Sequence, residues 1–162
     1  MKQLLSIFRD ARGVASVEFA LASLFMFGII SVALDFGYNM QQKLKLGSAV
    51  EQAAIIAYNE QTGSDTSRIS NFVVAAAGTK NTPTVVVTCN GSNSCGDGKC
   101  SCINSSGGFI SAASCNATCA GSNATSGNYM KIVATSTYNA VIVPNKWLNG
   151  TTMTSSAVVR LQ

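Results

Sequence analysis

Residues 14–34 of the chain read VASVEFALASLFMFGIISVAL, an apolar run of 21 residues in which Glu18 is the only charged side chain. A helix that spans a membrane needs about 20 consecutive, mostly apolar residues. The preceding residues 1–13 carry three basic side chains and one acidic side chain, a net charge of +2. Basic residues before the run predict a cytoplasmic N-terminus, so the rest of the chain is expected on the outer side of the membrane.

Three interpretations of this apolar run compete. A cleaved secretory signal has an apolar core of about 7–15 residues, whereas this run is longer and residues 32–35 make a poor cleavage site. An uncleaved anchor accounts for the length but leaves Glu18 unexplained. A carboxylate inside a membrane segment costs a few kcal/mol and by default marks function. The third interpretation therefore gives Glu18 a role in assembly.

Cleavage after Gly13 would explain the position of Glu18. Val14 would become the first residue of the mature chain, and Glu18 would become its fifth residue. The carboxylate would then lie about one helical turn from the new amine. It could neutralise the amine of a neighbouring subunit, although such a pair offsets its desolvation cost only when both partners are present.

The sequence around this position is similar to a known processing site. Residues 13–19, GVASVEF, resemble the site of type IV prepilins, with a short basic leader, Gly at the cut, Glu at mature position five and then an apolar helix. Residues 12–21, RGVASVEFAL, more closely resemble the TadE-like family, the minor pseudopilins of the tight-adherence (Flp) pilus system. The resemblance continues through LDFG at residues 34–37 and the Ala-rich AVEQAAIIA at residues 49–57.

The resemblance implies a function and a location. It implies a minor pilin or pseudopilin that takes part in assembling a Tad/Flp-type pilus for surface adherence. Gly13 and Val14 would form the site cut by a prepilin peptidase, and Glu18 with Phe19 would serve assembly. The chain would cross the bacterial inner membrane once, with a periplasmic C-terminal domain and possible incorporation into an extracellular pilus. Its partners would be the lipid bilayer, other pilin or pseudopilin subunits and the pilus assembly platform.

The polarity rises after Asp35, but helical periodicity continues. Apolar residues recur three or four positions apart, which places them on one helical face. We therefore expect one continuous helix over about residues 14–59, roughly 70 Å long at 1.5 Å per residue. Residues 14–34 would be its transmembrane and assembly half, and residues 35–60 an amphipathic stalk half. The apolar face of the stalk half consists of Leu46, Val50, Ala53 and Ala57.

Residues 61–162 are expected to form an extracytoplasmic α+β domain. Asp65 or Thr66 can cap a short helix that Gly78 ends. Runs of β-branched and aromatic residues between turn residues predict strands. The simplest arrangement of these elements is an antiparallel sheet packed on the outer half of the long helix, which is a pilin-like architecture. The expected strands are residues 84–89, 129–138 and 153–161, with residues 140–143 as either a further strand or a continuation of the second.

A polar, cysteine-rich loop over residues 89–119 interrupts this pattern. Between residues 90 and 127, 23 of 38 residues are Ser, Thr, Asn or Gly, so little apolar burial can offset the entropy of ordering. An even number of cysteines outside the cytoplasm predicts up to three disulfides, with the connectivity left open. Cys100 and Cys102 are expected to have different partners, and zinc is the alternative, although the spacing matches no recognised finger pattern. The six cysteines are Cys89, Cys95, Cys100, Cys102, Cys115 and Cys119.

Composition argues against several function classes. The chain has no histidine, which excludes Ser–His or Cys–His nucleophilic sites and any His-ligated metal. No carboxylate pair stands out for acid–base chemistry, and the net charge of +4 forms no basic stripe for nucleic acid. We therefore expect no catalytic residue, metal or cofactor. The alternative function is a membrane-anchored or secreted binding module, adhesin- or lectin-like, stapled by disulfides; a cysteine-based redox protein would require free thiols.

Overall fold

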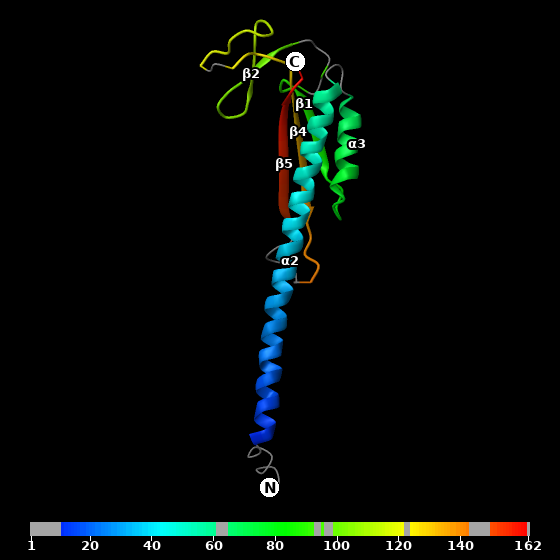
Figure 1. Cartoon of the computed structure of the whole chain (residues 1–162), viewed down its shortest axis with the longest axis vertical. Coiled ribbons are helices and arrows are strands. Elements are labelled where there is room, and N and C mark those ends of the chain that lie inside the picture. The colour runs from blue at the N-terminus through cyan, green and yellow to red at the C-terminus, as the bar shows by residue number, and fades with distance from the viewer. Residues whose placement is uncertain are drawn as a thin grey trace.

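The computed structural model describes residues 11–60, 65–92, 95, 99–121, 124–142 and 150–161. Figure 1 shows one long helix whose first half projects alone, while the other elements gather around its second half. The two described helices are α2 (Ala11–Glu60) and α3 (Thr66–Ala77). The strands of the described residues are β1 (Thr84–Cys89), β2 (Ser101–Ile103), β3 (Phe109–Ser111), β4 (Tyr129–Tyr138) and β5 (Thr151–Arg160). The chain is thus an α+β protein, as expected.

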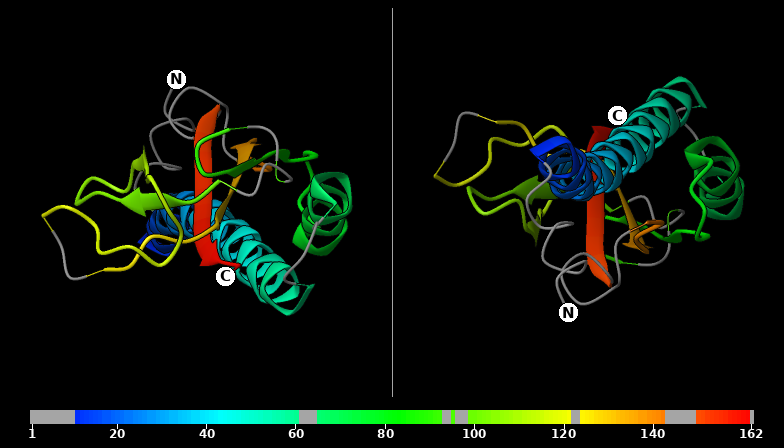
Figure 2. Two further views of the ribbon diagram at one scale, coloured as in Figure 1. Left: turned by 90° about the horizontal axis from the view of Figure 1, so that it is seen from above. Right: turned by 90° about the horizontal axis from the view of Figure 1, so that it is seen from below.

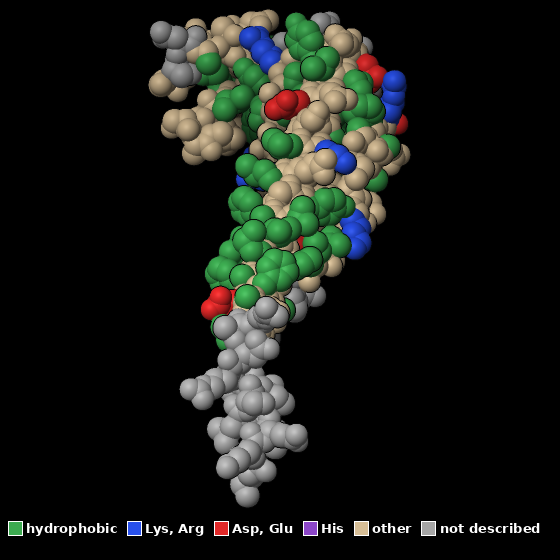
Figure 3. All heavy atoms as spheres, turned by 60° about the horizontal axis from the view of Figure 1, so that its bottom comes forward, with side chains coloured by type: hydrophobic (Ala, Val, Ile, Leu, Met, Phe, Trp, Pro, Cys, Tyr) green, Lys and Arg blue, Asp and Glu red, His purple; other side chains and the backbone are tan. Residues whose placement is uncertain are grey.

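The first half of α2 is exposed on all sides. Its large apolar side chains have exposed fractions such as 75% at Phe19 and 74% at Leu24. Figure 3 shows hydrophobic side chains covering the projecting part of the helix on the visible face. The helix is long and apolar enough to cross a membrane, and no part of its most apolar window is buried by the described protein. Of the expected leader at residues 1–13, only the last three positions are among the described residues.

The second half of α2 forms the core with α3 and the sheet. The predicted face of Leu46, Val50, Ala53 and Ala57 is completely buried. Burial of each Leu or Val side chain favours folding by about 1.5–3 kcal/mol. Figure 2, which looks along the long axis, shows α3 beside α2 on one side and the cysteine-rich segment on the opposite side. The stalk half is therefore the spine of the outer domain.

The main sheet has the antiparallel order β1-β4-β5. Side chains of β4 alternate between the helix-covered face and the open face, and Met130, Ile132 and Ala134 are fully buried. The helix α2 packs on β4 and β5, while α3 packs on β1. The strands β1 and β4 have the predicted bounds, and β5 begins two residues earlier than predicted.

The connection after β4 differs from the prediction. Residues 140–143 were expected to form or continue a strand, yet β4 ends at Tyr138 and residues 141 and 142 form a bend. The reason is a competing acceptor: the main-chain N–H groups of Val141 and Ile142 donate to the Asp35 carboxylate rather than to a strand. Residue 143 lies outside the described residues.

The short helix α3 follows its predicted boundaries. Asp65 precedes it and accepts a hydrogen bond from the main-chain N–H of Ser67 at 2.9 Å. Such a cap satisfies one of the free N–H groups at a helix start. Gly78 ends the helix with φ of 51°, a left-handed conformation that glycine adopts at little cost. The buried face of Ile69, Val73 and Ala77 then packs on the spine.

Candidate processing and assembly site

Gly13 and Val14 lie in the first turn of the described helix, far from the outer domain. A Cβ atom at Gly13 would meet nothing within 4 Å, and Val14 is 53% exposed. The hydroxyl of Ser16 donates to the Gly13 carbonyl at 2.8 Å, which is a local contact within the helix. The peptide bond between Gly13 and Val14 is therefore not covered by any described part of the chain.

Glu18 and Phe19 follow one turn later and are both exposed. Among the described residues the ion pair is Arg68 with Glu60, so Glu18 has no described cationic partner. A carboxylate surrounded by apolar side chains on a membrane-length helix is by default a candidate functional group. The structure thus brings together Gly13, Val14, Glu18 and Phe19 on one short exposed stretch of helix.

Asp35 is a buried acidic residue to which sequence reasoning assigned no role. It lies one residue after the expected membrane segment, and its exposed fraction is only 1%. Its Oδ1 accepts from the N–H of Val141 at 3.0 Å, and its Oδ2 accepts from the N–H of Ile142 at 3.1 Å. The Asp35 main-chain carbonyl also accepts from the Tyr138 hydroxyl at 2.9 Å. These contacts fasten the end of β4, and the two residues Val141 and Ile142 beyond it, to the middle of α2.

The same contacts change the acidity of Tyr138. Burial raises the pKa of the Tyr138 phenol, and the negative charge of Asp35 together with Tyr38 raises this pKa further. The rings of Tyr38 and Tyr138 lie with centroids 6.2 Å apart. Tyr138 is 3% exposed, so its hydroxyl is held in a dry environment by the helix that it contacts. The boundary between the two halves of α2 is consequently a packed joint rather than a free hinge.

All six cysteines form disulfides, as predicted. The pairs are Cys89–Cys95, Cys100–Cys115 and Cys102–Cys119, with Cα–Cα distances of 4.9, 5.2 and 5.7 Å. Cys100 and Cys102 therefore do have different partners. The alternative of a zinc site fails because no cysteine is free. Within the described residues, no cluster of metal-ligating side chains is present either.

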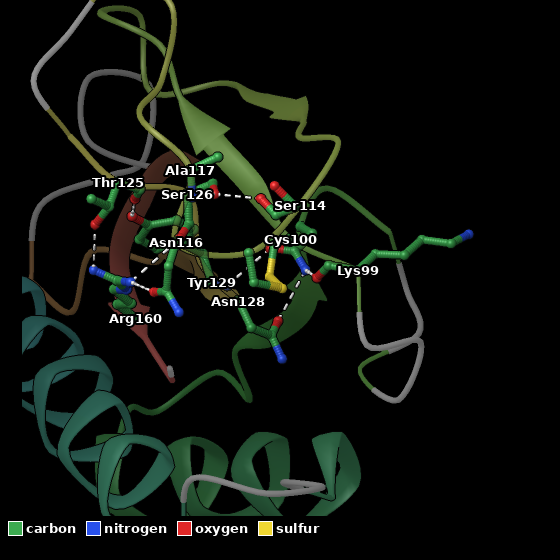
Figure 4. The surroundings of a disulfide bond; sticks show 12 residues. Lys99, Cys100, Ser114, Asn116, Ala117, Thr125, Ser126, Asn128, Tyr129 and Arg160 are labelled. Atoms are coloured by element: carbon green, nitrogen blue, oxygen red, sulfur yellow. Dashed lines mark hydrogen bonds between the residues drawn. A yellow bond between two sulfur atoms is a disulfide. The ribbon is translucent and has the colours of Figure 1, made fainter.

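The disulfides hold a small hairpin that was not expected. The strands β2 and β3 pair antiparallel, and Cys102 lies opposite Ile110. Arg160 fastens this region to β5, because its guanidinium donates to Thr125 Oγ1 at 2.9 Å and to Asn116 Oδ1 at 3.0 Å. Figure 4 shows the Arg160 side chain reaching toward both residues beside the Cys100–Cys115 bond. The loop is therefore cross-linked and tied to the sheet.

Most of the sequence of the long helix α2 matches a known protein family. The sequence model of the family described as TadE-like protein matches residues 13–54. No curated protein and no solved structure matches the chain significantly. The matched segment begins at Gly13 and contains Glu18, Phe19 and Asp35, as well as most of the buried stalk half. Over residues 13–54 the chain is TadE-like, which associates it with the Tad pilus system and with a membrane anchor formed by α2.

Proposed function

We propose that this protein is a minor pilin or pseudopilin that a prepilin peptidase cuts between Gly13 and Val14. The mature chain then takes part in assembling a Tad/Flp-type pilus for surface adherence. One observation carries the proposal: an exposed, apolar half-helix presents a single carboxylate, Glu18, five positions after an uncovered glycine. The family match over residues 13–54 supports it.

The proposal assigns a topology to the precursor. Residues 1–13 form a cytoplasmic leader, residues 14–34 cross the bacterial inner membrane, and residues 35–60 with the α+β domain lie in the periplasm. The basic leader favours this orientation. Three disulfides in the described domain favour an oxidising compartment such as the periplasm.

Glu18 acts by charge compensation in the assembled state. After cleavage, the new amine of Val14 and the Glu18 carboxylate are separated by about one helical turn along each chain. In the membrane, the amine of one subunit and the carboxylate of a neighbour neutralise each other. Removing one partner leaves a buried charge uncompensated, which is strongly unfavourable. Subunits that present both groups are therefore selected during assembly.

The processing step is tested by replacing the glycine. Gly13→Leu should block cleavage when the chain is produced together with its prepilin peptidase, because a bulky side chain stands at the cut. Gly28→Leu is the matched control, because Gly28 also lies in α2 and a Cβ atom there would meet nothing within 4 Å. N-terminal sequencing of both variants reports the result. Normal maturation of Gly13→Leu would refute the assigned cut.

The assembly step is tested at the carboxylate. Glu18→Ala should leave cleavage intact and reduce incorporation into the pilus fraction by about tenfold or more, because the neighbouring amine then lacks its partner. Ser23→Ala removes a polar side chain from the same helix segment and should assemble normally. The ratio of protein in sheared pili to protein in the membrane is the measurement. Equal ratios for Glu18→Ala and the native chain would contradict the role of Glu18 in assembly.

A further inference from the structure

Two large apolar side chains lie exposed where the outer domain meets the projecting half of α2. Val141 is 59% exposed and Ile142 is 51% exposed, and both belong to the segment after β4. Figure 1 shows this segment, in orange, reaching further toward the N-terminal end of α2 than α3 or the strands of the main sheet do. We call Val141 and Ile142 the boundary patch.

Asp35 holds the boundary patch at a defined level on α2. The main-chain N–H of Val141 donates to Asp35 Oδ1 at 3.0 Å, and that of Ile142 donates to Asp35 Oδ2 at 3.1 Å. Asp35 is the residue directly after the apolar run of residues 14–34. The boundary patch therefore lies beside the point where the apolar run of α2 ends.

The length of the apolar run relates this level to a bilayer. The 21 residues of the run extend over about 32 Å at 1.5 Å per residue, and the hydrocarbon core of a bilayer is about 30 Å thick. If residues 14–34 cross this core, Asp35 lies in the adjoining headgroup layer, which is about 5–8 Å deep on each side. The main-chain nitrogen atoms that bind Asp35 then lie in the same layer.

The chemistry of the segment suits contact with lipid. Residues 138–142 read YNAVI and contain no acidic or basic side chain. The Asp35 carboxylate is already buried and hydrogen-bonded, so lipid contact removes no exposed charge from water here. Single exposed apolar side chains are ordinary on protein surfaces, but adjacent ones that continue a larger apolar surface mark an interaction site. The larger surface in this case is the exposed first half of α2.

We propose that the boundary patch rests on the bilayer that α2 crosses, with Val141 and Ile142 inserted among the headgroups and upper acyl chains of the outer leaflet. This inference rests on the proposed function, because it requires residues 14–34 to span the membrane, and it adds a second lipid contact to that of α2. The partner is phospholipid, because the patch continues the apolar surface of α2 at the level where the run ends. Two contacts side by side fix the tilt of the outer domain relative to the bilayer.

Methyl NMR of the full chain in phospholipid nanodiscs tests the proposal. The Val and Ile methyl groups carry ¹³C, and part of the lipid carries a nitroxide at its headgroup. The signals of the boundary patch are assigned by their loss in Val141→Ala and Ile142→Leu. The control is Val158, which is 45% exposed and lies seven residues along β5 from Thr151, the partner of Tyr138. Paramagnetic relaxation should be at least about fivefold stronger at the boundary patch, because seven strand residues extend over about 24 Å.

A polar substitution tests whether the apolar side chains cause the contact. Ile142→Asn keeps the main-chain N–H that binds Asp35 but removes half of the apolar patch. Binding to a membrane interface scales with buried apolar area, so the relaxation enhancement at Val141 should fall about twofold or more. Val158→Asn is the matched control, and it should leave the enhancement at Val141 unchanged.

The outcomes separate this inference from the proposed function. Strong enhancement at Val141 and Ile142, with weak enhancement at Val158, supports the lipid contact. Enhancement at the boundary patch no greater than at Val158 overturns the inference, even when Val32 in the first half of α2 is strongly affected. If Val32 is unaffected as well, α2 does not cross the bilayer, and the membrane topology of the proposed function fails together with the inference.

Discussion

At the residue scale, Asp35 joins the long helix α2 to the folded domain. A buried carboxylate is tolerated when hydrogen bonds satisfy it, and Asp35 accepts from the N–H groups of Val141 and Ile142. The first exposed turn of the stalk thereby becomes a fixed attachment point for the segment after β4.

Asp35→Ala should destabilise the outer domain by about 2–3 kcal/mol, because the N–H groups of Val141 and Ile142 lose their acceptor. Thermal unfolding of the purified protein in detergent, followed by circular dichroism, measures this loss. Asp65→Ala removes an exposed helix cap and should cost only about 1 kcal/mol. Equal stability of Asp35→Ala and the native protein would show that the hydrogen bonds of Asp35 contribute nothing to the stability of the domain.

The Tyr138 phenol should titrate above the ordinary pKa of 10.0, because burial and the Asp35 charge disfavour its ionised form. A raised pKa in the folded state stabilises the fold while the phenol is neutral. That stabilisation is present below about pH 10 and is lost as the pH rises through the folded-state pKa. Absorbance titration of the four tyrosines should show one late transition, which Tyr138→Phe removes. Four tyrosines that titrate together would contradict the burial of the Tyr138 hydroxyl beside Asp35.

The candidate site at this scale stays a prediction. Glu18 is predicted because a single carboxylate in an apolar run is costly, and Gly13 is predicted from its position five residues before Glu18. Asp35 could not be identified, because it stands where the polarity of the helix rises and looks like an ordinary solvated acid. Its partners lie more than 100 positions later in the chain. No local pattern encodes such a contact.

At the scale of elements, periodic and β-branched segments were predicted correctly. The continuous helix α2, the capped helix α3 and the strands β1 and β4 each follow from local sequence. The hairpin of β2 and β3 was missed, because its three-residue strands lie in a polar segment and depend on which cysteines pair. The predicted strand at residues 140–143 was wrong, because the distant Asp35 takes the hydrogen bonds that a strand would need.

The disulfides should provide most of the order in the hairpin region. Replacing Cys102 and Cys119 together by Ala opens a link with a sequence separation of 17. In the chain-entropy account this costs about 3 kcal/mol. Amide hydrogen exchange should therefore accelerate in β2 and β3 while α3 stays protected. Exchange rates that stay the same after the replacement would mean that the Arg160 contacts and the main-chain hydrogen bonds of the hairpin keep this region ordered without the disulfide.

At the scale of the whole molecule, the chain is an anchor and a scaffold in one helix. As Figure 1 shows, the first half of α2 projects alone and its second half is the spine of an α+β domain, and Asp35 lies where the two halves meet. The first half of this helix presents Glu18, and the second half buries the face of Leu46, Val50, Ala53 and Ala57. In the proposed function, assembly and folding therefore use different parts of a single helix.

The most direct test of the central claim is the intact mass of the native protein, extracted from membranes without reductant after alkylation of any free thiol. We predict a chain that begins at Val14 and lacks six hydrogens, two for each of the three disulfides. A cut near Leu34 would identify an ordinary secreted protein, and Glu18 would then have no role in the mature chain. A chain that still begins at Met1 would contradict processing and favour a membrane-anchored binding module instead.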